Sequence, residues 1–267
     1  MKITKFLCFI SLLSGYSSVY SATVLYDQDF ENPASFVNNA GDVNIFNDVN
    51  SLYGDQPDGF TFAQKFTVET LLVTGNQAFG TGYSDPAGTA GNYAIGMLAN
   101  YQNDLLGLSF DIGTNNFLNT SIDLSSIDLS VFSGPFVPDG AIPTFEFTLF
   151  DNPFGITTTG GGTILDSIQV DAPASAKSVF DWTNVILPLD ATGNTNGNVT
   201  LRIDLIDGGY GAMDNLIIAA SDIAGDIGTP TQPPAAVSET TSLLLFGIGM
   251  LFPFISRRKK NYGQTRE

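Results

Sequence analysis

Short apolar runs alternate with clusters of Gly, Asn, Asp and Pro over most of the chain. Apolar and polar residues alternate with a period of two from Phe145 to Phe150 and from Val199 to Ile203, a pattern typical of half-buried β-strands. No stretch keeps the 3.6-residue period of an amphipathic helix over three turns. Roughly ten to twelve strands with turn signals between them predict an all-β domain over residues 22–228, folded as a two-sheet antiparallel sandwich or jelly roll.

The first 21 residues have the order of a secretory signal peptide. Lys2 and Lys5 precede an apolar run from Phe6 to Leu13, and small residues follow up to Ser21. The alternative is an uncleaved N-terminal anchor, but the apolar run is too short to cross a bilayer comfortably. We therefore expect residues 1–21 to be removed during export.

The C-terminal region has three parts in a fixed order. Residues 229–241 form a Pro- and Thr-rich spacer that ends in a short motif, residues 242–256 predict a transmembrane helix, and residues 257–267 form a basic tail. The basic cluster would stay cytoplasmic by the positive-inside rule. Together these parts predict a stop-transfer element that holds an exported domain at the inner membrane.

This arrangement resembles the PEP-CTERM sorting tail, in which Val-Pro-Glu-Pro is followed by an apolar helix and basic residues. The corresponding sorting motif is Val237, Ser238, Glu239 and Thr240, in which Val237 and Glu239 match the family, and the matching stop-transfer block is Arg257, Arg258, Lys259 and Lys260. Ser238 and Thr240 stand where the family has proline. The resemblance implies recognition by an exosortase-type sorting enzyme and a final place in the cell envelope, on the outer surface or outside the cell. The alternative is a plain single-span anchor.

The charge of the predicted domain excludes one class of partner. The chain has 27 acidic and 10 basic residues and no histidine, and residues 22–228 keep only Lys65, Lys177 and Arg202 against 25 acids. Such a surface repels phosphate backbones, so we expect no nucleic-acid binding. The one cysteine, Cys8, lies in the predicted signal peptide, so the mature chain would have neither a disulfide nor thiol chemistry.

Two acidic segments lie near the two ends of the domain, at residues 26–33 and 210–218. A jelly roll places its first and last strands side by side, so these acids could meet. The pair of segments resembles the carbohydrate-binding-module type of jelly roll, and that resemblance implies a structural Ca²⁺ held by Glu31 and Asp214, with Asp29 next. Hard oxygen ligands in a histidine-free chain favour calcium over zinc or copper. The alternative is that these acids end strands and form Asx turns.

Three aromatic residues are candidates for sugar contacts. Tyr83 and Tyr93 lie in glycine-rich or polar surroundings, which favours exposed rings. Trp182 is a candidate stacking platform, but an apolar run follows it directly, so a core position at the start of a strand is the alternative.

The missing residue types restrict catalysis. Without histidine, and without cysteine after processing, catalytic triads and histidine-metal mechanisms are excluded, which leaves carboxylate pairs as in glycoside hydrolysis. Glu146 points off the core face of its strand, and no acid alternates with it along that strand. We therefore expect a non-catalytic cell-surface or extracellular-matrix protein, with extracellular polysaccharide as a candidate partner. The alternative is a surface carbohydrate-binding module, and a glycoside hydrolase is the third hypothesis.

Overall fold

The computed structural model describes residues 21–36, 49–53, 61–65, 68–74, 83–99, 103–127 and 142–228. The predicted sorting motif, transmembrane helix, basic tail and nearly all of the signal peptide lie outside these ranges and stay predictions. Within the described ranges, no helix is long and apolar enough to span a membrane.

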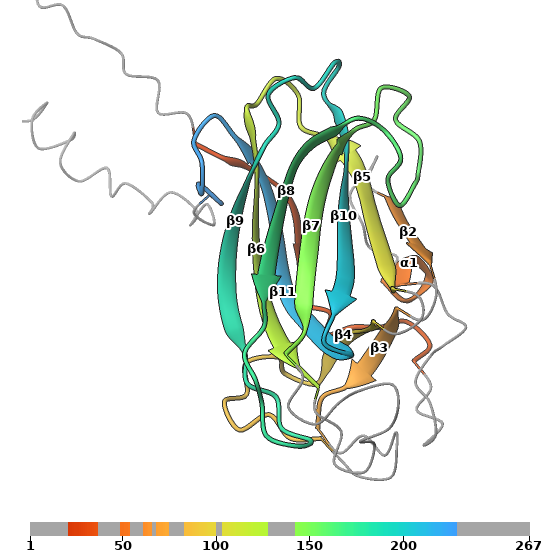
Figure 1. Cartoon of the computed structure of the whole chain (residues 1–267), viewed down its shortest axis with the longest axis vertical. Helices are drawn as coiled ribbons and strands as arrows, with labels where there is room; N and C mark the ends of the chain where they lie inside the picture. The colour runs from red at the N-terminus through yellow and green to blue at the C-terminus, as the bar shows by residue number, and fades with distance from the viewer. Residues whose placement is uncertain are drawn as a thin grey trace, which may run out of the picture. The chain divides into compact units, whose positions relative to one another are not determined.

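The described part is an all-β sandwich of two antiparallel sheets, as the alternating pattern predicts (Figure 1). The six-stranded sheet has the order β3 (Glu69–Leu72), β4 (Tyr93–Leu98), β11 (Tyr210–Ser221), β6 (Phe117–Ser126) and β9 (Thr183–Asp190), and β1 (Thr23–Gln28) also pairs with β11. The five-stranded sheet has the order β2 (Thr61–Lys65), β5 (Leu105–Asp111), β10 (Asn198–Asp207), β7 (Thr144–Asp151) and β8 (Ile164–Asp171). A four-residue helix, α1 (Val49–Leu52), precedes β2.

The first and last strands lie side by side, which confirms the expectation for a jelly roll. β1 pairs antiparallel with β11, and Asp27 lies opposite Ile217. The register shifts within β1 between Val24 and Tyr26, so the strand contains a β-bulge or a similar irregularity. This pairing brings the segment that follows β1 towards the middle of β11.

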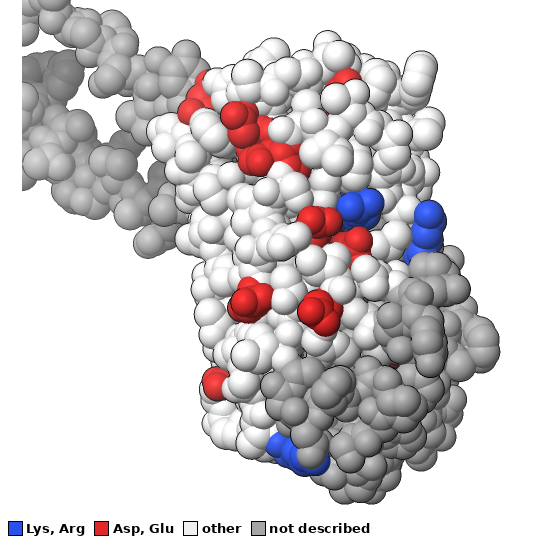
Figure 2. Space-filling view, in the orientation of Figure 1, with Lys and Arg blue, Asp and Glu red and all other residues white. Residues whose placement is uncertain are grey.

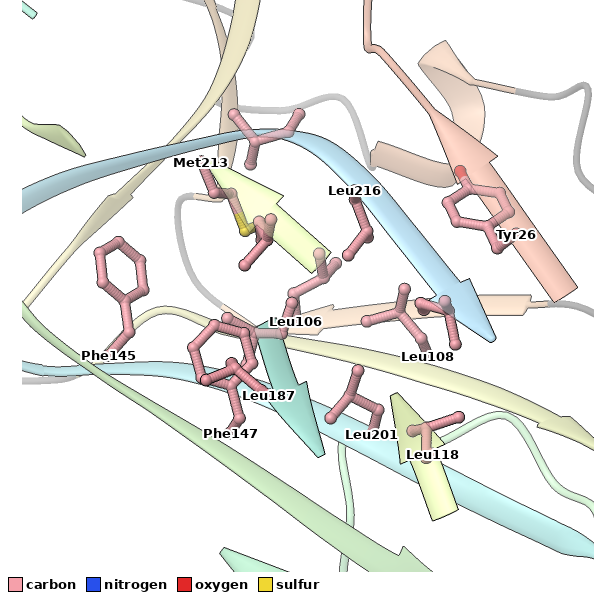
Figure 3. Packing of buried hydrophobic residues seen from close by; sticks show 14 of the residues in the cluster. Tyr26, Leu106, Leu108, Leu118, Phe145, Phe147, Leu187, Leu201, Met213 and Leu216 are labelled. Carbon is pink, nitrogen blue, oxygen red and sulfur yellow. The ribbon is translucent and has the colours of Figure 1, made fainter. Parts of the chain in front are cut away.

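The core lies between the inner faces of the two sheets. Strands β7 and β10 place alternate apolar residues inward, and Phe147 lies opposite Ile203 across the pair. Figure 3 shows Leu106, Phe147 and Leu201 of the five-stranded sheet meeting side chains from the six-stranded sheet, and each of these residues is buried. The period-two prediction for both strands is confirmed, because the inward set is apolar and the residues between them face outward.

The edge strands have residues that suit an edge position. Pro188 lies in β9, which is an edge strand, where a missing backbone N–H costs no internal ladder bond. β8 is an edge strand of the five-stranded sheet, and its residues are half-buried or exposed.

Gly211 in β11 tests how tightly the two sheets pack. A Cβ atom at this position would lie 2.5 Å from Cζ of the buried Phe145 ring. We predict that Gly211→Ala lowers the free energy of unfolding by about 1–3 kcal/mol, because the added methyl group would overlap the buried Phe145 ring and force it to shift. Gly96→Ala on the neighbouring strand is the matched control, since its methyl would meet the end of the Leu71 side chain at 3.0 Å. Urea unfolding measures both, and an equal loss in the two variants would contradict the prediction.

Candidate functional site

A pocket of about 270 Å³ opens at one end of the five-stranded sheet. Its walls come from the end of β7, the turn after β7, the segment before β8 and one residue of β10. The lining residues are Phe150, Asp151, Asn152, Pro153, Phe154, Ile156, Thr158, Gly160, Gly161, Gly162, Thr163 and Thr200. Phe154 is 84% exposed and Ile156 is 56% exposed, so the rim of the pocket presents apolar side chains to solvent.

The turn that carries Phe154 is held by a buried asparagine. The Asn152 side chain donates from Nδ2 to the Ile156 carbonyl at 2.8 Å and to Thr200 Oγ1 at 3.1 Å. Its Oδ1 accepts a hydrogen bond from the Ile156 backbone N–H at 3.3 Å. The Gly155 N–H donates to the Asn152 carbonyl at 2.9 Å, which closes the turn. Phe154 is therefore displayed on a preorganised turn, and its ring is not packed into the domain.

The opposite wall is a glycine-rich segment, residues 157–163, called the strap here. Gly160 and Gly161 have φ angles of 110° and 118°, a backbone region that side chains with a Cβ rarely adopt. A Cβ at Gly160 would lie 2.7 Å from the Phe150 ring, and Thr158 Oγ1 donates to the Gly160 carbonyl at 2.8 Å. Phe150 points away from the core yet is only 4% exposed, because the strap lies against it.

The strap also lies on the outer face of the sheet. Gly107 in β5 is directly opposite Arg202 in β10, and both residues lie between inward-facing neighbours. A Cβ at Gly107 would clash with the Thr158 carbonyl and with Thr159 Cα. The strap therefore occupies the space above Gly107, in the middle of the outer face of this sheet.

Arg202 forms a charged cluster beside the strap. Its guanidinium carbon lies 5.0 Å from the centre of the Phe150 ring, and its NH2 lies 3.5 Å from Glu146 Oε2. Its Nε lies 3.9 Å from Asp204 Oδ2. Burial raises the pKa of Asp204, while the charge of Arg202 and a hydrogen bond from Asn103 lower it.

No acid alternates with Glu146 along its own strand, as the sequence indicates, but the neighbouring strand supplies one. Asp204 lies directly opposite Glu146 on β10. The sequence could not show this pair, because the register between β7 and β10 decides it. Arg202 contacts both carboxylates, so they are partners in an ion-pair cluster.

Among the described residues that line the pocket, Asp151 is the only titratable one, and its carboxylate is fully engaged. Its Oδ1 accepts hydrogen bonds from Asn194 Nδ2 at 3.0 Å and from the Thr195 backbone N–H at 3.1 Å. The Thr195 hydroxyl lies 3.0 Å from Oδ2. This carboxylate holds the loop before β10 in place, which leaves the pocket with neutral polar groups and apolar surface.

The three predicted aromatic residues do not form one surface. Tyr83 packs edge-on against Phe180 with centroids 5.5 Å apart, and Phe180 stacks on Trp182 at 5.2 Å. The expectation of an exposed Tyr83 is wrong, because this ring is only 6% exposed in a small apolar cluster. Trp182 is half-buried against the same cluster at the start of β9, as the core alternative expects. Tyr93 is not part of this cluster. Its ring packs edge-on against the Phe36 ring, with centroids 5.0 Å apart.

Of the predicted calcium ligands, Asp214 has the most unusual surroundings. It is fully buried in β11, next to a register shift at Asn215, whose φ is 49°. Asp214 Oδ1 accepts a hydrogen bond from the Asn215 N–H at 2.7 Å. Asp214 Oδ2 is buried and has no hydrogen-bond partner among the described residues. A buried carboxylate oxygen of this kind must either carry a proton or meet a cation.

The other two predicted ligands are engaged in hydrogen bonds. Glu31 Oε1 accepts from the backbone N–H groups of Asn92 at 2.7 Å and Tyr93 at 3.0 Å, and Oε2 accepts from Asn92 Nδ2 at 2.8 Å. Asp29 Oδ1 accepts from the Glu31 N–H at 3.0 Å, which is the Asx-turn alternative. Glu31 therefore fastens the start of β4 to the end of β1.

Sequence reasoning missed a fourth acid, Asp123, which lies directly opposite Asp214 on β6. Its carboxylate accepts hydrogen bonds from Asn184 Nδ2 at 2.9 Å and Asn215 Nδ2 at 2.8 Å. Burial raises the pKa of Asp214 to about 8, and the charges of Glu31, Asp123 and Asp29 add to the rise against the Asn215 hydrogen bond.

The free Oδ2 of Asp214 fits a ligand for a hard cation, and calcium remains our proposal for it. The described residues contain no group of three or more His, Cys, Asp or Glu side chains placed to hold a metal ion. A cation at Asp214 would therefore complete its shell with backbone carbonyls or water.

One local sequence feature indicates the exposed rim of the pocket. Asn152-Pro-Phe-Gly155 is a strong turn sequence, and an aromatic residue inside such a turn has no strand partner to cover it. The exposure of Phe154 follows from that position. The strap gave no comparable signal, because nothing in Thr-Thr-Gly-Gly-Gly says which face of the sandwich it lies on.

No family model and no curated protein matches this chain. Solved structures similar to it include the K3 cleaved adhesin domain of Lys-gingipain from Porphyromonas gingivalis W83, with 11% identity, a TM-score of 0.39, and coverage of 73% of this chain and 98% of that chain. TmCBM61 in complex with β-1,4-galactotriose has 12% identity, a TM-score of 0.33 and coverage of 61% and 90%. The family 11 carbohydrate-binding module from Clostridium thermocellum has 11% identity, a TM-score of 0.33 and coverage of 62% and 92%. The fold described above rests on the strands and registers of this chain itself.

We predict that Asp214 makes the stability of the domain depend on pH. Its pKa is about 8 in the folded state against an ordinary 3.8, so the folded state holds a proton that the unfolded state releases between these values. The contribution of this group is complete below about pH 4 and is lost as the pH rises towards 8, by about 1 kcal/mol per pH unit. Urea unfolding at several pH values in EDTA measures the slope.

Asp214→Asn should remove this slope, whereas Asp27→Asn, at an exposed site on β1, should leave it. Calcium added at pH 8 should raise the stability of the wild-type chain and leave Asp214→Asn unchanged. A slope that persists in Asp214→Asn would contradict the assignment of the titrating group, and a wild-type chain indifferent to calcium would contradict the metal site.

Proposed function

We propose that this domain is a carbohydrate-binding module carried by an exported surface protein. The observation that carries the proposal is the pocket with Phe154 at its rim, 84% exposed on a turn fixed by buried Asn152. An exposed aromatic ring offers a flat apolar face to the C–H groups of a sugar ring. Threonine hydroxyls and backbone groups in the walls supply the few polar contacts that orient a ligand in such a pocket.

The arrangement of carboxylates supports binding over catalysis. Hydrolysis of a glycosidic bond needs two carboxyl groups on either side of the bond, one of them able to give up a proton. Asp151 is held by Asn194 and Thr195, and Glu146 and Asp204 share Arg202. Asp214 is fully buried. None of these described carboxylates faces the pocket as a free acid-base pair.

Export and sorting are the second part of the proposal. The support is the order of segments in the sequence: a signal-like start, the β domain, a spacer, a motif with Glu239 at its centre, an apolar run and a basic block. A module delivered in this way would meet polysaccharide outside the cell. Export would therefore place the proposed binding surface where its ligand is found. An exosortase-type enzyme is the proposed sorting partner.

We predict that Phe154→Ala weakens glycan binding about tenfold or more, because the stacking face is lost. The purified full-length chain is screened on an array of neutral and acidic glycans, and the strongest binder is followed by titration. The midpoint of thermal unfolding should stay within about a degree, since the ring is exposed. Ile223→Ala is the matched control, because Ile223 is also exposed, at 55%, in the segment after β11. Equal affinity in wild type and Phe154→Ala would refute the proposed site.

We predict that the protein recovered from its own host lacks both ends. Intact mass measured on envelope and medium fractions should correspond to loss of residues 1–21 and of everything beyond the motif at 237–240. Additional mass would report a group attached during sorting. A protein that keeps residues 243–267 would show that Ser238 and Thr240 prevent processing, and the domain would then be tethered by an ordinary membrane anchor.

A further inference from the structure

We infer that the pocket binds the terminal residue of a neutral glycan and excludes internal segments of a polysaccharide chain. This inference rests on the proposed carbohydrate-binding function. It follows from three features of the pocket: the strap that closes one side, the volume that remains, and the absence of a free cation among the described residues that line it.

The strap blocks the path that a long chain would take across the sheet. Residues Thr158 and Thr159 lie directly on Gly107, in the middle of the outer face of the five-stranded sheet. The same segment covers the outward-facing ring of Phe150. A polysaccharide that lay along the sheet face would have to pass through the strap. The strap thus bounds the pocket on the side of the sheet, and we expect a ligand to enter from the side of the exposed Phe154.

The volume agrees with entry of a chain end. About 270 Å³ lies just below the range of pockets that enclose drug-sized ligands, which is room for about one or two sugar rings. The exposed ring of Phe154 lies at the rim, where it can stack on the residue that enters or on the next one. Further sugar residues would extend into solvent and add little to the binding free energy.

The charges around the pocket select against anionic sugars. Asp151 is its only titratable lining residue among those described, and the nearest arginine, Arg202, already contacts Glu146 and Asp204. Residues 22–228 contain 25 acids against three basic residues, and Figure 2 shows acidic side chains in several separate places on one face of the domain. A uronic acid or a sulfated sugar would meet this negative field without a partner for its charge. Neutral sugars are not subject to that repulsion.

The experiment is a length series measured by titration calorimetry on the purified full-length chain. The probes are xylo-, cello-, manno- and β-1,4-galacto-oligosaccharides of two to six residues, with oligogalacturonates as the anionic series. For the neutral series that binds, we expect an affinity per chain that changes less than about twofold from three to six residues, and one protein bound per chain. We expect no binding of the oligogalacturonates.

Reduction of the terminal sugar to its alditol then identifies the end. Loss of binding assigns the reducing end and retained binding assigns the non-reducing end, and both results agree with recognition of one end. An affinity that rises steadily with length, or more than one protein on a hexasaccharide, would overturn chain-end binding while leaving carbohydrate binding intact. Absence of binding to every probe would overturn the proposed function itself.

Gly107→Ala gives an independent test, because its methyl would displace the strap from the sheet. We expect the affinity of this variant to differ between oligosaccharides of three and six residues, unlike that of the wild-type chain. Thermal unfolding checks that the variant is folded. If the variant does not fold, the length series on the wild-type chain decides alone. A folded Gly107→Ala variant with wild-type affinity at every length would contradict the role assigned to the strap.

Discussion

The register between β7 and β10 is the constraint on which the rest of the five-stranded sheet depends. With Phe147 opposite Ile203, one set of alternate residues from both strands enters the core, and the other set must form the outer face. That outer set brings Glu146 opposite Asp204 and Phe150 opposite Thr200. A slip of β7 by one residue would turn Glu146 towards the core and Phe145 and Phe147 outward. Hydrophobic burial therefore fixes the position of the polar residues outside as firmly as that of the core.

The strap and the pocket are consequences of this register. Phe150 is an apolar ring on an outer face, and covering such a ring is favourable because it removes apolar surface from water. Arg202 covers one part of it and the glycine-rich strap covers another, which requires glycine where the backbone approaches the ring and the sheet. The pocket is the space left between the strap and the turn of Phe154. Its shape is set by two loops that are each fixed by their own hydrogen bonds.

The sequence predicts features that depend on a single strand, such as its position and its buried face. It does not predict which residues of two paired strands lie opposite each other. Alternation predicted the strands from Phe145 and from Val199, because period two is visible without knowing the partner. Asp123 lies opposite Asp214 because of the register between β6 and β11, and no local sequence pattern encodes that register. Tyr83 was expected to be exposed because of its glycine-rich neighbours, yet Phe180 and the surrounding apolar cluster cover it. Phe154 was predictable in principle, since the turn that carries it is a local feature.

The two sheets deal with acidic residues in opposite ways. On the five-stranded sheet, Arg202 contacts both Glu146 and Asp204 and supplies one positive charge between them. The pocket beside them keeps one carboxylate that is saturated with hydrogen bonds. On the six-stranded sheet, Asp214 has no cation among the described side chains and sits among other acids, so a proton or a bound cation must balance its charge. The predicted sensitivity to pH and the proposed calcium site therefore lie in the six-stranded sheet, while the proposed ligand selection lies in the loops of the other. Because the two regions share no described residue, a change at Asp214 should alter the stability of the domain without altering which sugar it selects.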